Sequence, residues 1–501
     1  MIELKHVSIF NDNHTYVKDL SFTLNPKDKL AIIGEEGNGK STLLKSILGI
    51  APYVKVEGKI KINGKIGYLA QSLEESLLSL VVKDYIFNDE IDYYNKINAL
   101  YHYVNLLNIN ETLMYQVLGT LSGGEKVKVA LLQILLDNPD ILFLDEPTND
   151  LDIETLRWLE NFIITCDKPI IYVSHDETLL SRTANAILHL EQIKKKQSCR
   201  HTYIKIDYDT YVEKRLRAIQ HQTQIARSER REYKEKEERL RQVMQRVEHE
   251  QRTISRQDPH GGQLLKKKMR ALKSQERRLD NTTITEMPDV EEGINFFFVD
   301  TYVPSSKVIL DLKLDELRVD HKILAKDIKL EVIGNTHLCI IGNNGTGKTT
   351  LIKIIYNLLK DRNDIKVGYM PQNYLDIFKD YTYVLDFIAP SKKKEDITRA
   401  RTYLGNMKFT KEEMVGKISD LSNGSKAKLF LSKFTLDKYD VLILDEPTRN
   451  VSPLSNPIIR KALSEFTGCI ISVSHDRKYL DEVIDDLYYL DKNGLHKIYD
   501  Y

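Results

Sequence analysis

The chain has 501 residues, of which 42% are hydrophobic and 29% charged, and its 73 Lys and Arg are balanced by 73 Asp and Glu. This length is too great for one ordinary hydrophobic core and predicts two or three domains, while the composition excludes a largely disordered chain. A formal net charge of zero excludes a nucleic-acid-binding protein only if the charge is spread evenly along the chain.

Targeting signals and cysteines indicate a compartment. No run of about 18 apolar residues is present, so no transmembrane helix is expected. The N-terminal MIELKHVSIF lacks a basic segment followed by a long apolar one, so no signal peptide is predicted. The four cysteines are scattered without a CxxC pair, which fits neither a disulfide framework nor a zinc site. We therefore expect a cytoplasmic protein without a membrane or transmembrane partner.

The first motif along the chain is GEEGNGKST (Gly34–Thr42), which follows an apolar run at 30–33 and precedes an apolar helical pattern. This is a P-loop, whose glycines let backbone N–H groups surround phosphates at a helix N-terminus. Lys40 is expected to reach the β- and γ-phosphates of ATP, and Ser41 to ligate Mg²⁺. The nucleotide-binding candidates are Gly34, Gly37, Gly39, Lys40, Ser41 and Thr42.

Acidic residues and a histidine follow two later apolar strands. Asp145 ends the first of them, where a carboxylate can hold the Mg²⁺ shell. Glu146 comes next and can polarise an attacking water, although an acid that only caps the turn before Pro147 is the alternative. His175 follows the second strand, and its alternative reading is a packed loop histidine.

Between about Asp207 and Asp280 the sequence changes character. It is rich in Arg, Lys, Glu and Gln, and apolar or small residues recur every seven positions. A break at Asp258–Gly262 is a helix stop and turn, so the pattern predicts an antiparallel helical hairpin whose tip lies at about 255–264. Its first helix, of roughly 45 residues, would span about 65 Å. The seam residues are Val212, Ile219, Ala226, Tyr233, Leu240, Val247 and Ile254, then Leu265, Leu272 and Leu279.

The zero net charge hides a division along the chain. Residues 211–280 hold 20 Lys and Arg against 11 Asp and Glu, a net +9, whereas the rest holds 53 (73 − 20) against 62 (73 − 11), a net −9. For residues 211–250, a charged helix face that is only exposed to solvent is an equally good interpretation. The basic cluster that follows residue 250 instead favours a role in neutralising phosphates. The RNA-binding candidates are Arg252, Arg256, His260, Lys266, Lys267, Lys268, Arg270 and Lys273.

The last part of the chain repeats the first. GNNGTGKTT (Gly342–Thr350) repeats the P-loop, and VLILDEPT and SVSHD repeat the later segments, with 30 residues from the Asp to the His in both copies. This predicts a duplicated ATPase domain, at 1–195 and 296–501, with a linker at 196–295. The repeated candidates are Gly342, Gly345, Gly347, Lys348, Thr349, Thr350, Asp445, Glu446 and His475.

Two further repeated motifs, IGYLAQ/VGYMPQ and LSGGE/LSNGS, together with the P-loops and the switch histidines His175 and His475, resemble the ATP-binding cassette superfamily. Two cassettes, a charged helical linker and no membrane domain resemble its ABC-F class, whose members are ribosome-associated ATPases. The implied fold class is α/β, with two ABC-type P-loop ATPase domains joined by a long antiparallel α-helical hairpin linker. The implied state is a monomer in which each ATP lies between one P-loop and the LS motif of the other half.

The resemblance also assigns roles. It makes Gln71 and Gln372 sensors of the γ-phosphate and Mg²⁺, makes Glu146, Glu446, His175 and His475 catalytic, and places an adenine-stacking aromatic about 30 residues before the P-loop lysine. That position is Phe10 in the first half and Arg318 in the second. For Phe10 a plain core residue is the alternative, and for Arg318 the alternative is a solvated surface residue. The LS-motif candidates are Ser122, Gly123, Gly124, Ser422 and Gly424, and the metal candidates are Ser41, Gln71, Asp145, Thr349, Gln372 and Asp445.

Two departures from the family pattern fall on one site. LSNGS carries Asn423 and Ser425 in place of Gly and an acid, and TRNVSPLS (Thr448–Ser455) replaces a TNHLD-like segment. Both belong to the half that completes the site built on Lys40, so we expect ATP at both sites with unequal hydrolysis rates.

The segment TRNVSPLSNPIIR (Thr448–Arg460) resembles the antibiotic-resistance branch of ABC-F, of the lincosamide, streptogramin A and pleuromutilin type. The resemblance implies that the ATP-bound form occupies the E site of the 70S ribosome. The linker would then reach toward the peptidyl-transferase centre, where it meets 23S rRNA and P-site tRNA and the drug leaves, and ATP hydrolysis would drive release. The alternatives are an ABC-F translation factor without a resistance role, the ATPase subunit of an exporter, and a DNA-repair ATPase.

Overall fold

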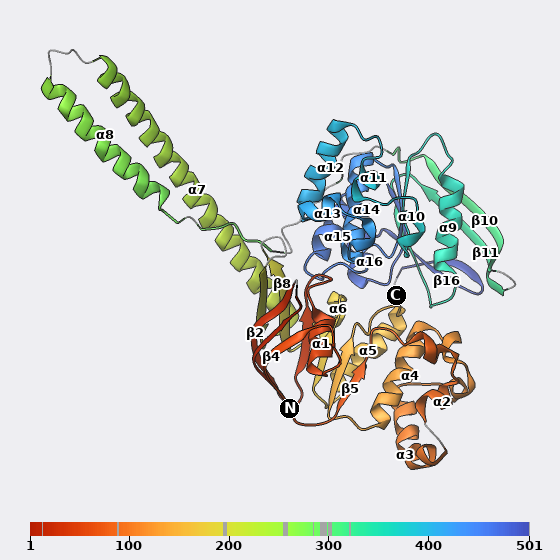
Figure 1. The fold of residues 1–501 in the computed structure, drawn as a ribbon. Helices are drawn as coiled ribbons and strands as arrows, with labels where there is room; N and C mark the ends of the chain where they lie inside the picture. Colours follow the sequence, from red (N-terminus) through yellow and green to blue (C-terminus); the bar gives the residue numbers. More distant parts are fainter. Residues whose placement is uncertain are drawn as a thin grey trace. The chain divides into compact units, whose positions relative to one another are not determined.

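The computed structural model describes residues 1–12, 14–87, 90–193, 198–253, 259–283, 285–290, 298, 303–319 and 322–499. These form two units (Figure 1): a globular unit, Met1–Tyr208 with Val290–Tyr501, and a second unit, Asp209–Asp289, which we call the arm. The globular unit holds a first cassette before the arm and a second cassette after it. Arg256 and Ile254 lie outside the described residues, as does most of the predicted hairpin tip.

The first cassette is built on a six-stranded sheet in the order β5-β6-β7-β3-β8-β9, parallel except for β9. The strands β3, β6 and β7 are buried along their whole length, as expected for apolar strands covered on both faces. A second, antiparallel sheet has the order β2-β1-β4, and β2 lies against β9. The strands are β1 (Ile2–Phe10), β2 (Thr15–Leu24), β3 (Lys29–Ile33), β4 (Lys55–Ile62), β5 (Ile66–Leu69), β6 (Ile141–Asp145), β7 (Ile170–Val173), β8 (Ala186–Ile193) and β9 (Ser198–Ile204); the helices are α1 (Lys40–Ile47), α2 (Val82–Ile86), α3 (Glu90–Leu106), α4 (Gly123–Leu136), α5 (Ile153–Thr165) and α6 (Glu177–Thr183).

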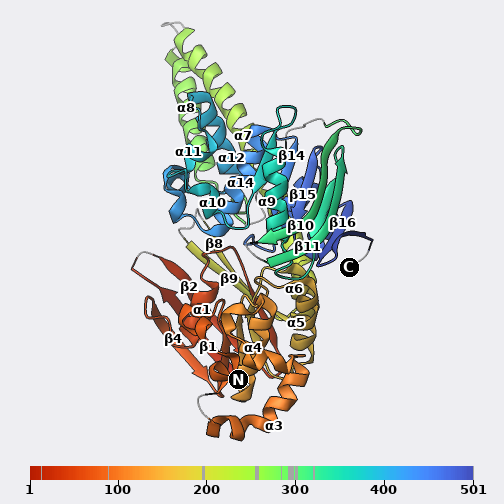
Figure 2. The ribbon, with the colours of Figure 1, turned by 90° about the vertical axis from the view of Figure 1, so that its right-hand side faces the viewer.

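The second cassette repeats this plan, with the sheet order β13-β14-β15-β12-β16-β17 and only β17 antiparallel. Its antiparallel pair β10–β11 has β11 against β17 (Figure 2). The predicted fold class, two P-loop ATPase domains with a helical insertion between them, is therefore confirmed. The strands are β10 (Val308–Val319), β11 (Lys322–Ile333), β12 (His337–Ile341), β13 (Val367–Met370), β14 (Val441–Asp445), β15 (Cys469–Val473), β16 (Asp486–Asp491) and β17 (Gly494–Ile498); the helices are α9 (Lys348–Leu359), α10 (Leu375–Phe378), α11 (Val384–Ile388), α12 (Lys394–Asn406), α13 (Lys411–Val415), α14 (Asn423–Asp437), α15 (Asn456–Ser464) and α16 (Arg477–Val483).

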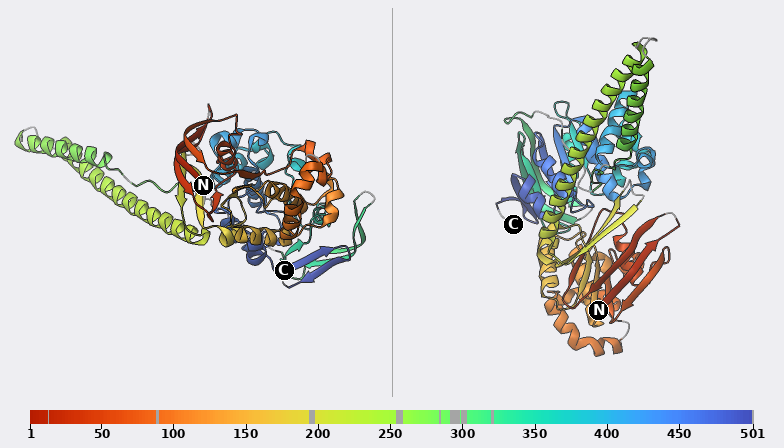
Figure 3. Two further views of the ribbon diagram at one scale, coloured as in Figure 1. Left: turned by 90° about the horizontal axis from the view of Figure 1, so that it is seen from below. Right: turned by 90° about the vertical axis from the view of Figure 1, so that its left-hand side faces the viewer.

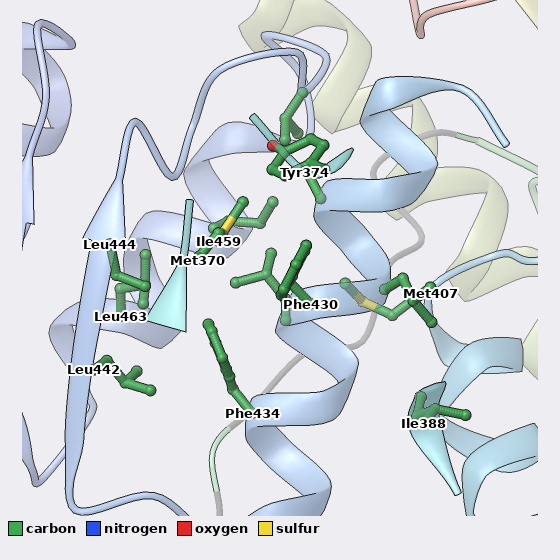
Figure 4. Close-up of a cluster of buried hydrophobic side chains, with 14 of the residues drawn as sticks. Met370, Tyr374, Ile388, Met407, Phe430, Phe434, Leu442, Leu444, Ile459 and Leu463 are labelled. Atoms are coloured by element: carbon green, nitrogen blue, oxygen red, sulfur yellow. The ribbon is translucent and has the colours of Figure 1, made fainter. Parts of the chain in front are cut away.

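A buried aromatic and aliphatic cluster fixes α14, the helix that begins with the LSNGS motif. Phe430 on α14 lies between Met370 of β13 and Met407 beyond α12, and Phe434 follows one turn later along α14 (Figure 4). Phe430 is 1% exposed and its ring centroid is 5.5 Å from that of Tyr374. Side chains this large and this well enclosed leave α14 little freedom to shift alone. The N-terminus of α14 is therefore held at a defined place in the second cassette.

The arm consists of two long helices, α7 (Tyr208–Thr253) and α8 (Pro259–Asp280), which run antiparallel and lie side by side in Figure 1 and in the right-hand view of Figure 3. Of the predicted seam residues, Ala226, Val247 and Leu272 are buried and the other described members are half-buried. Outside the seam, the amide nitrogen of Gln222 donates to the carbonyl of Glu286 at 3.1 Å. No helix in the described part of the chain is both long and apolar enough to cross a membrane.

Candidate nucleotide-binding sites and nucleic-acid interface

Each P-loop connects a fully buried strand to a helix that begins at its lysine. At Gly34 and Gly342 the backbone has φ of 142° and 151°, and a Cβ there would lie 2.2 Å from the carbonyl oxygen of Leu190 or 2.4 Å from that of Leu490. Only glycine fits such a position. The ammonium group of Lys40 donates to the carbonyls of Gly34 and Glu35 at 2.8 and 3.0 Å, so its charge is held over the loop. Lys348 does the same in the second cassette.

The site built on Lys348 is a cavity of about 1500 Å³ whose wall is formed by both cassettes. Such a volume exceeds that of ordinary small-molecule sites, which reach roughly 1,000 Å³, and so has room for a nucleoside triphosphate. The second cassette contributes Gly345, Gly347, Lys348, Thr349, Thr350, Gln372, Asp445, Glu446 and His475. The first cassette contributes, among others, Ser122, Gly123, Glu125, Asn149, Asp150 and His175. The structure thus brings one P-loop together with the LS motif of the other half, as the resemblance implied.

Direct contacts join the two halves beside this cavity. The amide of Asn344 in the second P-loop donates to the carbonyl of Asp150 at 2.5 Å, and its backbone N–H donates to Asp152 Oδ2 at 3.3 Å. Gly124 packs so closely on α5 that a Cβ would lie 2.6 Å from Thr155 Oγ1. The turn that follows Asp145 and Glu146 in the first cassette therefore contacts the second P-loop directly.

The acidic residues of the Lys348 site are buried. Asp445 is 1% exposed, and neither of its carboxylate oxygens has a hydrogen-bond partner among the described residues. A buried carboxylate without a partner, next to the Thr349 hydroxyl and Gln372 on the same wall, fits a divalent cation. Burial, with a contribution from Asp445, raises the pKa of Glu446 to about 8. Burial, together with nearby Lys348, lowers the pKa of His475 to about 3.

The site built on Lys40 has the same residues in a different hydrogen-bond network. Ser41 Oγ donates to Asp145 at 2.7 Å, and Gln71 Nε2 donates to Glu146 Oε2 at 2.8 Å. Burial raises the pKa of Glu146, but His175, Lys40 and Asn149 outweigh it and lower the pKa to about 2. Glu146 therefore already has an amide donor, and the surroundings of the two glutamates shift their pKa values in opposite directions. Both glutamates have positive φ, 51° and 56°, which points their side chains away from the regular strand direction.

Two P-loop glutamates bridge the cassettes at the Lys40 site. Glu36 accepts a hydrogen bond of 2.5 Å from the backbone N–H of Gly424, at the N-terminus of α14. Glu35 forms an ion pair with Lys428, which is 7% exposed. On the same side, His175 Nδ1 donates to the carbonyl of Val451 at 2.8 Å. Sequence reasoning missed Glu35, Glu36 and Lys428, although the contrast between GEEG and GNNG in the two P-loops was a visible signal.

The unusual LS motif changes how its helix is capped. In the first cassette Ser122 accepts from the N–H of Glu125 at 3.3 Å while Glu125 accepts from the N–H of Ser122 at 2.8 Å, which is a reciprocal capping box. In the second cassette the Ser422 side chain accepts from the N–H of Ser425 at 3.1 Å, and its hydroxyl donates to Ser425 Oγ. The departure at Ser425 therefore replaces a reciprocal charged cap by a neutral, one-way cap.

The aromatic residue that the structure shows against the first P-loop is Tyr16. A Cβ at Gly39 would lie 2.9 Å from Tyr16 Cβ and Cδ1, whereas Phe10 is the half-buried last residue of β1, paired with Thr15 and Lys55. The matching residue in the second cassette is Leu324, which lies 2.8 Å from such a Cβ at Gly347 and lines the large cavity. Arg318 forms an ion pair with Glu316. Tyr16 and Leu324 share an offset of 24 residues before Lys40 and Lys348, which was the signal for finding them.

The basic residues predicted on the second arm helix are exposed. Lys266, Lys267, Lys268, Arg270 and Lys273 all lie on the surface of α8, whose seven Lys and Arg face only Glu276 and Asp280 along the helix. None of the five has an ion-pair partner in the part of the chain that the structure describes. In α7, by contrast, glutamates neutralise the bases one turn later, as in Glu213–Arg217, Glu232–Lys236 and Glu235–Arg239. Arg252 and His260 are also exposed.

A family model described as "ABC transporter" matches residues 17–149 and 325–449, which is more than half of the chain. The chain belongs to this ABC transporter family. Within it, the relatives place the chain in the ABC-F class, and its two cassettes make it an ATP-binding ATPase.

The similar curated proteins extend over nearly the whole chain. The ATP-binding protein Uup of Buchnera aphidicola is 27% identical over 99% of this chain and 81% of its own length. The putative ATP-binding protein YdiF of Bacillus subtilis is 26% identical over 94% and 76%. The ABC transporter F family member 2 of Arabidopsis thaliana is 24% identical over 99% and 77%.

Two solved structures share the fold of this ABC-F ATPase at low sequence identity. One is the archaeal ribosome recycling factor aABCE1 in complex with the ribosomal stalk protein aP1, with a TM-score of 0.61 at 17% identity over 99% of this chain and 90% of that one. The other is a model of ribosome-bound archaeal Pelota and ABCE1, with a TM-score of 0.56 at 16% identity over 98% and 78%. At these identities they support the arrangement of the elements and nothing finer.

Proposed function

We propose that this ABC-F ATPase is a ribosome-binding clamp that protects the ribosome from antibiotics. In the proposed cycle, ATP closes the two cassettes and the closed form binds the E site of the 70S ribosome in the cytoplasm. The arm then reaches toward the peptidyl-transferase centre, where contacts with 23S rRNA and P-site tRNA displace the drug. Hydrolysis of ATP reopens the cassettes and releases the protein. The observation that carries the proposal is the row of exposed cations on α8, which have no ion-pair partner among the described residues.

The clamp is supported by the composition of the Lys348 cavity. Its wall comes from both cassettes, so a ligand bound there interacts with both halves and favours the state in which they are paired. At the Lys40 site the parts also come from both cassettes, through Glu36 and Gly424. Binding free energy is thereby converted into closure, and hydrolysis removes it.

Residue roles follow from position. Lys40 and Lys348 neutralise the phosphates, Glu146 and Glu446 polarise the attacking water, and His175 and His475 hold their glutamates, at 3.7 and 3.8 Å between Nε2 and Oε1. Ser41, Gln71 and Asp145, and Thr349, Gln372 and Asp445, are the residues that would hold Mg²⁺. When bound, the cation neutralises charge on the β- and γ-phosphates.

An RNA partner is supported by the charge on α8 and by the relatives. Five exposed cations on 22 residues, without acidic partners in the part of the chain that the structure describes, fit phosphate contacts better than a packed helical surface does. The two solved structures of similar fold are those of an archaeal ribosome recycling factor and of ribosome-bound archaeal Pelota and ABCE1. Backbone contacts of this kind read the shape of RNA, so the affinity should fall steeply with salt.

The test of ribosome binding uses Glu146→Gln with Glu446→Gln. The double variant keeps every phosphate-binding residue but cannot polarise water, so it is expected to pellet with ribosomes in ATP and not in ADP. The matched control is the single Glu146→Gln variant, which retains one site that can hydrolyse ATP. Absence of the double variant from the ribosome pellet at low salt contradicts the proposal.

The test of the arm reverses Lys266, Lys267 and Lys268 to Glu. Ribosome binding is expected to be lost while the ATPase rate without ribosomes is unchanged, since the cassettes form a separate unit. The matched control reverses Lys234, Lys236 and Arg239, three bases of α7, two of which already pair with glutamates. Equal loss of binding in both variants would mean that overall arm charge, and not the α8 row, is what matters.

The resistance role is tested by growth. Expression in a drug-sensitive host is expected to raise the inhibitory concentration of lincomycin or tiamulin, and Lys40→Ala with Lys348→Ala is expected to abolish that effect. The second candidate, an ABC-F translation factor without a resistance role, is favoured by relatives such as Uup and is indicated by ribosome binding without protection.

A further inference from the structure

Four charged residues lie buried where helices of the two cassettes meet. Glu160 on α5 and Glu177 on α6 come from the first cassette, and Arg460 on α15 and Arg477 on α16 from the second. They are 2%, 5%, 1% and 6% exposed, in that order. Charges are almost never this deeply buried unless they are paired, so their partners define the contact.

Each arginine pairs with a glutamate of the opposite cassette. Arg460 donates to Glu177 through both terminal nitrogens, Nη1 to Oε1 at 2.5 Å and Nη2 to Oε2 at 3.2 Å, which is a bidentate pair. Arg477 Nη2 donates to Glu160 Oε1 and lies 3.5 Å from Asp176 Oδ2. Burial would lower the pKa of Arg460, but its hydrogen bonds with Glu177 and Glu482 raise it.

These four residues occupy only two positions of the repeated cassette. Glu160 stands 15 residues after Asp145, and Arg460 stands 15 after Asp445; Glu177 and Arg477 each stand two residues after the switch histidine. The pairs therefore cross, since the α5/α15 position of one cassette meets the α6/α16 position of the other. The first cassette has an acid at both positions and the second has a base at both.

This distribution has a consequence for which cassettes can associate. Two first cassettes joined through the same surfaces would place Glu160 against Glu177 twice, and two second cassettes would place Arg460 against Arg477 twice. Like charges in a buried contact are unfavourable, because Arg182 beside Glu160 and Glu482 beside Arg460 compensate the charges only in part. Only a first cassette with a second cassette satisfies all four groups.

We infer that Glu160, Glu177, Arg460 and Arg477 form a charge code that restricts each cassette to the opposite cassette as its partner. Two P-loop domains of the same fold offer each other similar surfaces, so without such a code identical halves of different molecules would compete. The covalent linkage then makes the partner in the same chain the one at the highest effective concentration. The surface is thus a recognition element, in addition to the two nucleotide sites.

The test uses two full-length variants with opposite signs. Arg460→Glu with Arg477→Glu gives a chain with four acids at the contact, and Glu160→Arg with Glu177→Arg gives a chain with four bases. Each alone is expected to lose cassette pairing, and its ATPase rate to fall by about tenfold or more. An equimolar mixture is expected to form a heterodimer, seen by size exclusion with light scattering, with recovery of ATPase activity.

Further measurements distinguish a loss of cassette pairing from a loss of folding. Thermal unfolding followed through Trp158, the one tryptophan of the chain, reports whether each variant folds. A variant with all four substitutions restores opposite signs and is expected to regain monomeric ATPase activity in part, because the flanking Arg182 and Glu482 keep their signs. Lys461→Glu, an exposed reversal on α15, is the matched control and is expected to change nothing.

Two results overturn the inference. One is wild-type ATPase activity and a monomeric state in both sign-reversed variants. The other is failure of both the mixture and the fourfold variant to regain activity, which would show that the four residues serve local stability without selecting a partner.

Discussion

The two glutamates of the first P-loop hold the Lys40 site in a state that a nucleotide must disrupt. The Glu36 carboxylate lies on the Gly424 N–H, at the N-terminus of α14, and Glu35 lies on buried Lys428. A helix N-terminus with a free N–H binds anions, including phosphate. An ATP phosphate between this P-loop and the LSNGS motif therefore competes with Glu36 for the same donor. We predict that Glu36→Asn raises nucleotide affinity at this site.

The magnitude follows from the contacts. A hydrogen bond to a charged group contributes about 1.5–3 kcal/mol net, and about 1.4 kcal/mol is a tenfold change in a binding constant. Removing Glu36 alone is therefore expected to tighten nucleotide binding by about tenfold to a hundredfold. Replacing Glu35 as well leaves Lys428 unpaired at 7% exposure, which costs the ligand-free contact about 1–3 kcal/mol and frees a cation for the phosphates.

The assay is a titration with a fluorescent ATP analogue in the Lys348→Ala background, so that the Lys40 site dominates the signal. Glu35→Asn with Glu36→Asn converts GEEG into the GNNG of the second P-loop, which makes the chain its own reference. The mirror variant, Asn343→Glu with Asn344→Glu in a Lys40→Ala background, is expected to weaken binding at the Lys348 site. Unchanged or weaker binding after Glu36→Asn would show that Glu36 does not occupy the phosphate position.

Three further perturbations have defined outcomes. Gly34→Ala puts a Cβ 2.2 Å from the Leu190 carbonyl and is expected to abolish nucleotide binding at the Lys40 site and lower the melting temperature; wild-type titration curves would contradict this. Tyr16→Ala is expected to weaken binding of ATP at that site more than Phe10→Ala does, because Tyr16 lies on Gly39, and the reverse ranking in a nucleotide titration would restore Phe10 as the stacking residue. Leu272→Ala is expected to destabilise the α7–α8 seam by about 2–3 kcal/mol, seen as faster hydrogen exchange of arm amides with unchanged exchange in the cassettes.

Sequence predicted the features whose signal is local or periodic. The P-loops depend on a few glycines and a lysine within nine residues, and the arm on a repeat of seven, so both were visible without any knowledge of packing. Phe10 was chosen by a count of residues along the chain. The β1–β2 pair has register shifts on both sides of Ile9, so counting residues there does not give position in space, and the structure shows Tyr16 against Gly39.

The contacts that distinguish the two nucleotide sites could not be predicted from the sequence, because they join residues that are far apart along the chain. Glu35 and Lys428 are 393 residues apart, and Arg460 and Glu177 are 283 apart, so neither pair has a local signal. They appear only once each cassette has folded and met the other. A sequence can show that GEEG differs from GNNG, but it cannot show what the glutamates touch.

The two nucleotide sites have the same motifs but differ in the residues that surround them. At the Lys348 site a wide cavity lies between an asparagine-rich P-loop and a fully capped LSGGE helix. Asp445 on its wall is buried and has no hydrogen-bond partner among the described residues. At the Lys40 site the P-loop already contacts the opposite cassette through Glu35 and Glu36, and Glu146 is already ionised with Gln71 bonded to it. The Lys348 site is therefore open to a nucleotide. At the Lys40 site the Glu36 carboxylate joins the cassettes until a nucleotide phosphate displaces it. The departures in LSNGS and GEEG therefore act as a matched pair, since the helix that lost its own capping glutamate accepts one from the P-loop across the contact.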